Sequence, residues 1–367
     1  MNETYMIDYI RYESTMVKEI VTNRFSYISE LVEVLVSGKI KRIYFSGHGS
    51  PYNVGEIIRL MMSKLLRMEV TNDCPTLFNN HLEFNVNGIY DKEEMLLICP
   101  AQSGKTSGPF NAVLKAKELG IKTVCLTMNP TGLLAENSDI VIDKKSGEEI
   151  SFAETKGHVA SLTIMMLAVI EAAYKLETIT NEEYQKYING FDKVVVSMSE
   201  AVTVTMKWYE KYRDILMNQS YFTFIGYGPN YVTANEGGLK ILETTLLPCL
   251  CYELEEYMHG KNQLVSKDSV IFFIAPKEKE QSRMFKLYEW CKKTSKNCIL
   301  ISSFDNKFID ENSITCNFAD IEFLTTLEYL IPFQVISYLL ANDLGKSTVI
   351  ANHNNAGNEL QTRIMSE

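Results

Sequence analysis

The sequence predicts an α/β protein that consists of two similar three-layer αβα domains, each built around a parallel sheet. Short apolar runs alternate with helical patterns along the 367 residues, which is typical of parallel strands covered by helices on both faces. A partial repeat at about half the chain length indicates that this architecture occurs twice. The predicted organisation is a helical segment 1–30, a first domain 31–178, a polar helical linker 179–215, a second domain 216–345 and a tail 346–367.

Within the first predicted domain, short apolar runs mark the strands. We expect them at 41–47, 67–72, 95–100, 121–127 and 139–143. Helical patterns predict helices near 52–66, 107–119 and 155–177. Because parallel strands need long crossover connections, this alternation favours a parallel sheet.

The repeat consists of two similar stretches. Each combines an aromatic strand, a Gly-x-Gly turn and the start of a helix. Residues 43–53 resemble residues 222–231, and strands at 269–275 and 297–303 would then match those at 94–100 and 121–127. Neither copy has the third glycine of a dinucleotide-binding fingerprint, because Tyr52 and Tyr231 occupy its place. A nicotinamide cofactor is therefore not expected.

Residues 102–107, after the predicted strand 95–100, have the composition of an anion-binding loop. The loop supplies an amide from Gln102, a cation from Lys105 and hydroxyls from Ser103, Thr106 and Ser107. It opens a predicted helix, whose first N–H groups and dipole favour negative charge. A phosphate ester fits this set, and an ordinary N-capped strand–helix turn is the alternative.

The Gly-Lys-Thr sequence of this loop resembles a nucleotide P-loop but lacks the first glycine of that motif. Cys99 stands at that place, and Leu340 stands there before a second match at 345–347. A single phosphate on a small molecule is therefore expected. The equivalent stretch of the second half, 277–281, is charged and has no hydroxyls, so the anion site is predicted in one half only.

Two segments of the second half carry candidate acid–base groups. Glu236, Lys240 and Glu243 are spaced three and four apart, which places them on one face of a helix. A solvated helix face with a salt bridge is the alternative. His259 follows the carboxylates of 253–256 and precedes a glycine. It is an acid–base candidate or, alternatively, a surface histidine beside acidic residues.

Composition and charge exclude several other classes of function. The chain has 36 basic and 46 acidic residues, and its net charge of −10 is spread without a basic block, which argues against nucleic-acid binding. No apolar stretch is long enough to span a bilayer, and the start of the chain lacks the pattern of a signal peptide. The eight scattered cysteines indicate free thiols. We therefore expect a cytoplasmic protein with no membrane, nucleic-acid or metal partner.

Five motifs that occur in order resemble the double sugar-isomerase (SIS) domain family. They are Gly-x-Gly-Ser at 47–50, Gln-Ser-Gly-x-Thr at 102–106, a lysine on the next long helix, Glu-Gly-x-x-Lys-x-x-Glu at 236–243 and Glu-x-x-His-Gly at 256–260. The resemblance covers about residues 30–345 and is similar to the isomerase half of glucosamine-6-phosphate synthase. It implies flavodoxin-like sheets and sugar-phosphate chemistry without a cofactor.

Carried over position by position, the resemblance implies two groups of site residues. Those that bind the sugar phosphate would be Ser50, Gln102, Ser103, Lys105 and Thr106. Glu243 would move a proton between carbons 1 and 2, Lys240 would assist it, and His259 would assist ring opening from a neighbouring subunit. Weaker substrate contacts are implied for Glu154 and Glu256. A homodimer with a shared active site follows from this resemblance.

The chain also departs from the synthase pattern. Ala101 and Pro51 replace serines, Glu154 stands where the synthase has serine, and the tail offers Arg363 instead of the lysine that forms a Schiff base there. Lys105 makes the loop similar to that of fructosamine-6-phosphate deglycases. We therefore expect a deglycase that splits a ketosamine (Amadori) 6-phosphate into a hexose 6-phosphate and an amine. An aldose–ketose isomerase, an amino-sugar-phosphate deaminase and a catalytically silent sugar-phosphate sensor are the alternatives.

Overall fold

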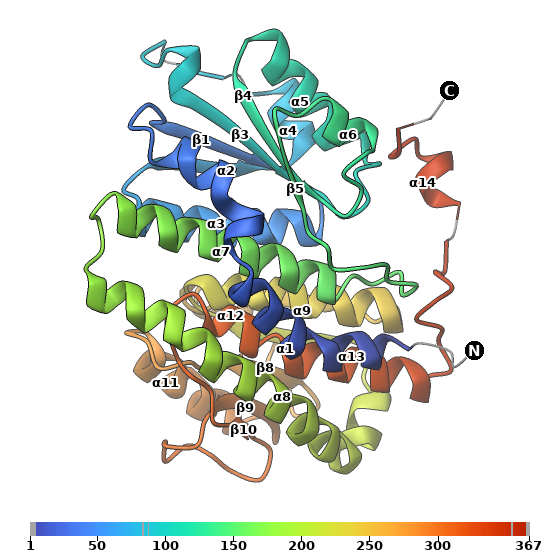
Figure 1. Ribbon diagram of the computed structural model, residues 1–367. Coiled ribbons are helices and arrows are strands. Elements are labelled where there is room, and N and C mark those ends of the chain that lie inside the picture. The colour runs from blue at the N-terminus through green and yellow to red at the C-terminus, as the bar shows by residue number, and fades with distance from the viewer. Residues whose placement is uncertain (1–4, 83, 87, 354, 365–367) are drawn as a thin grey trace. The chain divides into compact units, whose positions relative to one another are not determined.

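The computed structural model describes residues 5–82, 84–86, 88–353 and 355–364. Two five-stranded parallel sheets flanked by helices form its framework, which confirms the predicted α/β class (Figure 1). Each sheet belongs to its own compact unit. The β1–β5 unit contains the described residues of 16–149, 156–188 and 352–367, and the β6–β10 unit contains those of 1–15, 150–155 and 189–351. The chain therefore passes between the units more than once.

The sheet of the β1–β5 unit has the strand order β2-β1-β3-β4-β5. Its strands are β1 (Arg42–Ser46), β2 (Glu69–Asp73), β3 (Met95–Pro100), β4 (Lys122–Thr127) and β5 (Ile140–Asp143). All neighbouring pairs are parallel. Every residue of the central strand β3 is buried, as expected of a strand covered on both faces.

Two groups of helices cover this sheet (Figure 1). One group packs together as α2 (Phe25–Leu35), α3 (Ser50–Leu65) and α7 (Lys156–Lys175), and the other as α4 (Pro75–Asn80), α5 (Ser107–Glu118) and α6 (Leu133–Glu136). The expectation that no apolar stretch is long enough to span a bilayer is wrong for α7, because the helix continues through Glu171 to Lys175; however, 94% of its most apolar 18-residue segment is buried inside the protein. Core helices of soluble proteins have the same character, so this burial is weak support for a soluble protein.

The sheet of the β6–β10 unit has the order β10-β9-β8-β6-β7. Its strands are β6 (Phe222–Gly226), β7 (Cys249–Glu253), β8 (Val270–Ile274), β9 (Asn297–Ser303) and β10 (Ile314–Cys316). Numbered within its own sheet, this order is the same as that of the first sheet. The internal repeat read from the sequence is thus a repeat of topology.

Helices again pack on both sides of this second sheet. α9 (Pro229–Thr245), α12 (Thr325–Glu328) and α13 (Ile331–Asp343) pack together, while α10 (Leu254–Met258) contacts β6 and β7 and α11 (Gln281–Lys292) contacts β9. The remaining helices are α1 (Met6–Thr22), α8 (Asn181–Met217), α14 (Ala356–Glu359) and the short 3₁₀ turns η1 (Lys92–Glu94) and η2 (Lys261–Leu264). The predicted linker 179–215 falls almost entirely within α8.

The strand order creates one favoured binding position in each sheet. In each sheet, the connection after the first strand leads to the second strand on one side, and the connection after the third strand leads to the fourth strand on the opposite side. The two connections therefore diverge. A crevice therefore opens at the carboxyl ends of these two adjacent strands, and ligands of such sheets bind there. In the first sheet the position lies at β1 and β3, and in the second at β6 and β8.

Candidate functional site

The predicted phosphate loop follows β3 and therefore lies at the favoured position of the first sheet. Residues Arg42 and Phe45 of β1 pair in parallel register with Met95 and Ile98 of β3, so both strands end at the same edge. The turn after β1 reaches Ser50, which is buried and begins α3. The fold thus brings the Gly-x-Gly turn and the 102–107 loop to one edge, although about 50 residues separate them in sequence.

The loop itself has its hydroxyls at the surface. Ser103 and Lys105 are exposed, and the Lys105 N–H donates a 3.3 Å hydrogen bond to Ser103 Oγ. Gly104 has φ +66°, and a Cβ at this position would lie 3.2 Å from Thr127 Oγ1. Thr106 occupies the N-cap position of α5 but makes no side-chain capping hydrogen bond. The hydroxyl of Thr106 is therefore not used as a cap, which weighs against the alternative of an ordinary N-capped turn.

The C-terminal segment of the chain pairs with this loop. Thr106 and Arg363 form an antiparallel bridge, the Ser107 N–H donates to the Thr362 carbonyl at 3.0 Å, and the Ile364 N–H donates to the Lys105 carbonyl at 2.7 Å. The N–H of Ser107 is thus occupied, and Pro109 has none. Fewer first-turn N–H groups of α5 are available to an anion than the sequence indicates, so the loop hydroxyls carry more of the recognition.

Lys144, which the sequence analysis missed, contacts the loop from the protein interior. It directly follows β5, is 1% exposed, and donates hydrogen bonds to Gln102 Oε1 and, at 3.4 Å, to the Gly157 carbonyl. Gln102 Nε2 in turn lies 3.2 Å from Met128 Sδ. A buried cation therefore orients the Gln102 amide and adds positive charge beneath a site predicted to bind phosphate. Nothing in the local sequence around residue 144 indicates this role.

His48 is a second residue that the sequence analysis did not single out. Its ring lies against the start of α5, where a Cβ on Gly108 would come within 2.7 Å of His48 Nε2 and also of Pro75. Partial enclosure lowers the pKa of His48. The imidazole is therefore neutral near pH 7 and can donate or accept a hydrogen bond at this edge, but it adds no charge.

The second predicted group of residues forms a buried charged cluster on α9. Lys240 Nζ lies 3.3 Å from Glu236 Oε1 and 2.9 Å from Glu243 Oε2. The side chains of Lys240 and Glu236 are each 1% exposed, and that of Glu243 is 30% exposed. This helix face is buried, so the alternative of a solvated surface salt bridge does not hold. Only Glu243 of the three retains a substantial opening to solvent.

Electrostatics set different protonation states for the two central groups. Burial raises the pKa of Glu243, Lys240 lowers it, and Glu236 and Glu154 raise it further, with a net upward shift. Burial lowers the pKa of Lys240, but the surrounding carboxylates more than compensate and hold it above its usual value. Lys240 is therefore a permanent cation, whereas Glu243 is a carboxylate with a strengthened basicity. A base beside a fixed cation can move a carbon-bound proton and stabilise the negative oxygen that results.

Glu154 contributes to the same cluster from a separate segment. Residues 150–155 belong to the β6–β10 unit, and the Phe152 N–H there donates to the Thr348 carbonyl at 3.2 Å. Glu154 is partly buried and interacts electrostatically with both Lys240 and Glu243. Glu154, for which the resemblance implies only a weaker substrate contact, therefore helps to raise the pKa of both Lys240 and Glu243.

His259 and Glu256 lie away from this cluster in the described chain. His259 ends α10, is exposed, and its Nδ1 lies 2.7 Å from the Glu255 carbonyl. Because a carbonyl only accepts, Nδ1 carries the proton and Nε2 remains for another partner. Within the described residues no hydrogen bond or ion pair joins His259 to Lys240 or Glu243. Glu256 forms a 2.6 Å surface ion pair with Lys261, and this ion pair lowers the pKa of Glu256.

Comparison with known proteins gives the family. The SIS domain model matches residues 38–171 and 215–341, which together make up more than half of the chain. The chain belongs to the SIS domain family. Each match covers one of the two sheets, so the repeat of topology is a pair of SIS domains.

Three relatives illustrate the similarity of this SIS protein to known proteins. It is 24% identical to the glutamine–fructose-6-phosphate aminotransferase (isomerizing) of Bartonella henselae over 84% of this chain and 50% of that protein. Its fold matches a candidate phosphosugar isomerase of Clostridium difficile 630 with TM-score 0.86 at 23% identity, covering 99% and 100% of the two chains. It also matches glucosamine-6-phosphate deaminase of Thermotoga maritima with TM-score 0.71 at 20% identity, covering 94% and 98%. The chain spans about half the length of the curated relatives it matches.

The favoured position of the second SIS domain differs in charge from that of the first. A Cβ at Gly228, after β6, would lie 3.6 Å from Glu278 Oε2, so a carboxylate faces this turn. Lys277, in the same loop, is ion-paired with Asp305. A carboxylate at this edge disfavours a phosphate, and the anion site in one half only stays a prediction.

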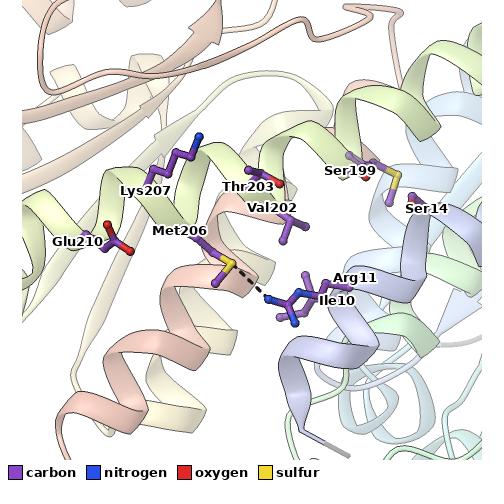
Figure 2. A pocket seen from close by; sticks show the side chains of 10 residues that line it. Ile10, Arg11, Ser14, Ser199, Val202, Thr203, Met206, Lys207 and Glu210 are labelled. Atoms are coloured by element: carbon purple, nitrogen blue, oxygen red, sulfur yellow. Dashed lines mark hydrogen bonds between the residues drawn. The ribbon is translucent and has the colours of Figure 1, made fainter.

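The SIS protein also has a surface cavity apart from these groups, between α1 and α8 (Figure 2). Its volume is about 470 Å³, and none of its lining residues belongs to the predicted site. Arg11 Nη2 lies 3.7 Å from Met206 Sδ across it, with Ser14, Ser199 and Thr203 along its wall. Lys207 and Glu210, three residues apart on α8, also line it. Among the described residues, no three His, Cys, Asp or Glu side chains are grouped to hold a metal ion.

Proposed function

We propose that this SIS protein is a sugar-phosphate enzyme that cleaves a ketosamine 6-phosphate into a hexose 6-phosphate and an amine. The observation that carries the proposal is the buried Lys240–Glu243 pair, at 2.9 Å, in which Glu243 alone is open enough to meet a substrate. A protein that only bound a sugar phosphate would have no need of a basic carboxylate beside a fixed cation. The likeness to an aminotransferase of fructose 6-phosphate and to a deaminase of glucosamine 6-phosphate supports an amino-sugar substrate.

The proposed reaction starts from the open-chain ketosamine, with a carbonyl at carbon 2 and the amine on carbon 1. Glu243 removes a proton from carbon 1, and the electron pair forms the carbon 1–carbon 2 double bond of an enaminol. The Lys240 ammonium stabilises the negative charge that moves onto the carbon 2 oxygen. Glu243 then returns the proton to carbon 2, and the nitrogen gives up its own proton to the carbon 2 oxygen, which leaves a neutral imine at carbon 1 and a hydroxyl at carbon 2. Water hydrolyses this imine to the aldehyde of the hexose 6-phosphate and the free amine.

Phosphate recognition is assigned to the loop of the first SIS domain. Ser103, Lys105 and Thr106 offer two hydroxyls and a cation, and Gln102 is held by Lys144. Hydrogen bonds to a charged group contribute about 1.5–3 kcal/mol each, so a few of them anchor a substrate firmly.

We further propose a homodimer in the cytoplasm, in which His259 of one subunit serves the site of the other and assists ring opening. The support is that His259 is exposed, that its Nδ1 is already bonded within its own chain, and that Nε2 is left for another partner. The second candidate function is aldose–ketose isomerisation, because the same proton transfer between carbons 1 and 2 interconverts these sugars without an amine.

The decisive experiment supplies the purified protein with a set of phosphorylated ketosamines and measures the release of glucose 6-phosphate in a coupled assay. Glu243→Gln protein is the matched control, because it keeps the shape of the side chain and loses the base. The deglycase proposal expects release with at least one ketosamine and none with the control. Conversion of fructose 6-phosphate without release from any ketosamine would favour the isomerase instead. No turnover of either class would favour the sugar-phosphate sensor.

A further inference from the structure

The C-terminal segment 355–364 reaches the predicted phosphate loop 102–107 as one side of a short antiparallel ribbon. Both stretches belong to the β1–β5 unit. Thr106 pairs with Arg363, and backbone hydrogen bonds of 3.0 and 2.7 Å flank this pair on either side. The ribbon therefore has a defined register, and this register decides which side chains of the two segments lie together.

The register places Arg363 beside the hydroxyl of Thr106. Hydrogen bonds that flank an antiparallel pair instead of joining it identify a non-hydrogen-bonded pair. The Cα atoms of such a pair are about 4.5 Å apart, and both side chains project from the same face. Lys105 precedes Thr106, and consecutive side chains of an extended segment point to opposite faces. In the described ribbon, Arg363 is therefore the cation on the face of the Thr106 hydroxyl.

The guanidinium of Arg363 has no competing carboxylate in the described part of the chain. The residue is exposed, and none of the described Asp or Glu side chains forms an ion pair with it. Its side chain lies along the turn of α14, where a Cβ at Gly357 would be 2.9 Å from Arg363 Nε. A guanidinium offers its N–H donors in a planar fork that matches two phosphate oxygens at once. Arg363 thus has the charge and the donors of a phosphate ligand.

Pairing of the C-terminal segment removes one donor from the loop and supplies another. The N–H of Ser107, which belongs to the first turn of α5, is used by the segment and is lost to an anion. Arg363 comes with the same segment and carries a full positive charge. Charge-assisted hydrogen bonds are roughly twice as strong as neutral ones, so this exchange favours the binding of a phosphate.

We propose that Arg363 is a phosphate-binding residue, so that the C-terminal segment completes the anion site of the first SIS domain. This inference rests on the proposed function, because it adds a ligand to the phosphate site assigned there. The ligand class is the phosphate ester of a sugar, whose oxygens Arg363 contacts together with Ser103 and Thr106. Binding of the ester and pairing of the segment then stabilise each other.

A ligand that cannot react tests this contact without turnover. The probe is glucitol 6-phosphate, which has no carbonyl group, and isothermal titration calorimetry measures its dissociation constant. Arg363→Gln should weaken binding at least about tenfold, as the loss of one charge-assisted contact predicts. Arg363→Lys keeps the charge without the fork, so its affinity should lie between the two.

Arg67→Gln is the matched control, because it removes the same charge from the same unit. Arg67 is exposed and precedes β2, so it lies at the opposite edge of the parallel sheet from the loop that follows β3. Its affinity for glucitol 6-phosphate should equal that of the wild type. Thermal unfolding of each variant confirms that the protein is folded.

Hydrogen–deuterium exchange separates a direct contact from a long-range charge effect. Saturating glucitol 6-phosphate should slow exchange in segment 355–364 of the wild type, because a phosphate held by Arg363 keeps the ribbon paired. In saturated Arg363→Gln this slowing should be lost. A charge that acted only at long range would weaken binding and leave exchange in the segment unchanged.

Three results would overturn the inference. They are unchanged or tighter binding by Arg363→Gln, no ligand-dependent slowing of exchange in segment 355–364 of the wild type, and no binding of glucitol 6-phosphate by the wild type. Tighter binding would mean that the segment competes with the phosphate for the N–H of Ser107.

Failure of this inference differs from failure of the proposed function. If Arg363→Gln weakens binding and abolishes the slowing of exchange, but no ketosamine is cleaved, the deglycase reaction is wrong and Arg363 remains a phosphate ligand. If ketosamines are cleaved and Ser103→Ala weakens binding while Arg363→Gln does not, the reaction stands and the loop binds the phosphate without the C-terminal segment.

Discussion

At the scale of single residues, the central feature is the effect of burial on Lys240 and Glu243, which have an ordinary helical spacing. Glu243 and Lys240 lie three residues apart on α9, an arrangement that stabilises exposed helices by only a few tenths of a kcal/mol. Here the ammonium is 1% exposed and the carboxylate 30%. The same ion pair therefore holds a permanent cation beside a carboxylate whose pKa is raised.

The first prediction concerns Glu243 as the base. Glu243→Gln should lower kcat by at least about 100-fold with little change in the KM of a phosphorylated substrate, because general bases typically contribute about 10²–10⁴-fold to rate. Steady-state kinetics on the substrate found by the screen measure both constants. In the wild type, kcat/KM should rise with pH as Glu243 loses its proton, with a midpoint above that of an ordinary glutamate. A variant that kept its full activity would show that the base is another group.

The second prediction concerns Lys144 beneath the phosphate loop. Lys144→Met should raise the KM of a phosphorylated substrate about tenfold, because Gln102 loses the donor that orients its amide. Ser103→Ala is the comparison and should raise KM by about 10- to 100-fold through loss of a direct charge-assisted hydrogen bond. Neither variant should change kcat greatly. Unchanged KM in both would place the anion site elsewhere.

At the scale of secondary-structure elements, α9 and α12 determine how the second SIS domain holds its charged groups. α9 packs against α13 through Gly237, where a Cβ would lie 2.6 Å from the ring of Phe333. The glycine thus allows the helix that carries Lys240 and Glu243 to approach its neighbour closely. α12 places Glu328 in the interior, where its carboxylate accepts hydrogen bonds from the N–H groups of Ala319 and Asp320 at 2.8 and 3.0 Å.

The third prediction follows from the close approach of α9 and α13. Gly237→Ala should lower the free energy of unfolding by about 1–3 kcal/mol, because the added methyl group forces the two helices apart or moves Phe333. Urea unfolding monitored by circular dichroism measures the change. Leu242→Ala, at an exposed position of the same helix, is the control and should have a smaller effect. A Gly237→Ala protein as stable as the wild type would mean that the ring of Phe333 moves aside at no cost.

The fourth prediction concerns the pH dependence of stability through Glu328. Burial raises the pKa of Glu328 to about 7 from its usual 4.5, against the lowering effect of its hydrogen bonds. Because the folded state holds this proton more tightly than the unfolded state, Glu328 contributes most stability below pH 4.5, and this contribution is lost as pH rises toward 7. Relative to the wild type, Glu328→Gln should therefore show a flatter fall in stability between these pH values. Urea unfolding at pH 5 and pH 7.5 checks the difference, and equal slopes would contradict the assignment.

At the scale of the whole molecule, the two SIS domains share one topology but differ in the charged and polar groups at their favoured positions. The first has a hydroxyl-rich loop at its favoured position, and the second has Glu278 at the corresponding turn together with the charged helix α9. The proposed function thus assigns phosphate binding to one copy of the fold and proton transfer to the other. The proposed contribution of His259 extends this division to a second copy of the chain.

The fifth prediction tests that shared site by subunit exchange. Glu243→Gln and His259→Ala proteins should each be inactive alone. After mixing and exchange, mixed dimers would contain one site with both wild-type groups, so about a quarter of the wild-type activity should return in dimers formed at random from equal amounts. Differently tagged subunits, recovered together, verify that exchange has occurred. Verified exchange without recovery of activity would rule out the contribution of His259 from a partner.

Much of the fold was predictable from local pattern. β3 is an apolar run and β4 has the apolar centre Val124–Leu126, each between helical patterns, so their positions agree with the prediction to within about one residue. β7 and β10 were not among the predicted strands. β7 and β10 are edge strands: β7 is only half-buried, and its apolar run Cys249–Tyr252 has four residues, while β10 has three residues in all, so both are shorter than the buried runs that mark central strands.

The sequence by itself determined the composition of the phosphate loop, the spacing of Glu236, Lys240 and Glu243, and the repeat of one α/β architecture, because these depend on residues close together in the chain. Tertiary structure alone decided that the α9 face is buried, that Lys144 lies under Gln102, and that Glu154 acts on Lys240 and Glu243. The physical reason is that burial and charge interactions depend on distance in space. Packing brings together groups that are about 40 to 90 residues apart, and no local periodicity records that approach.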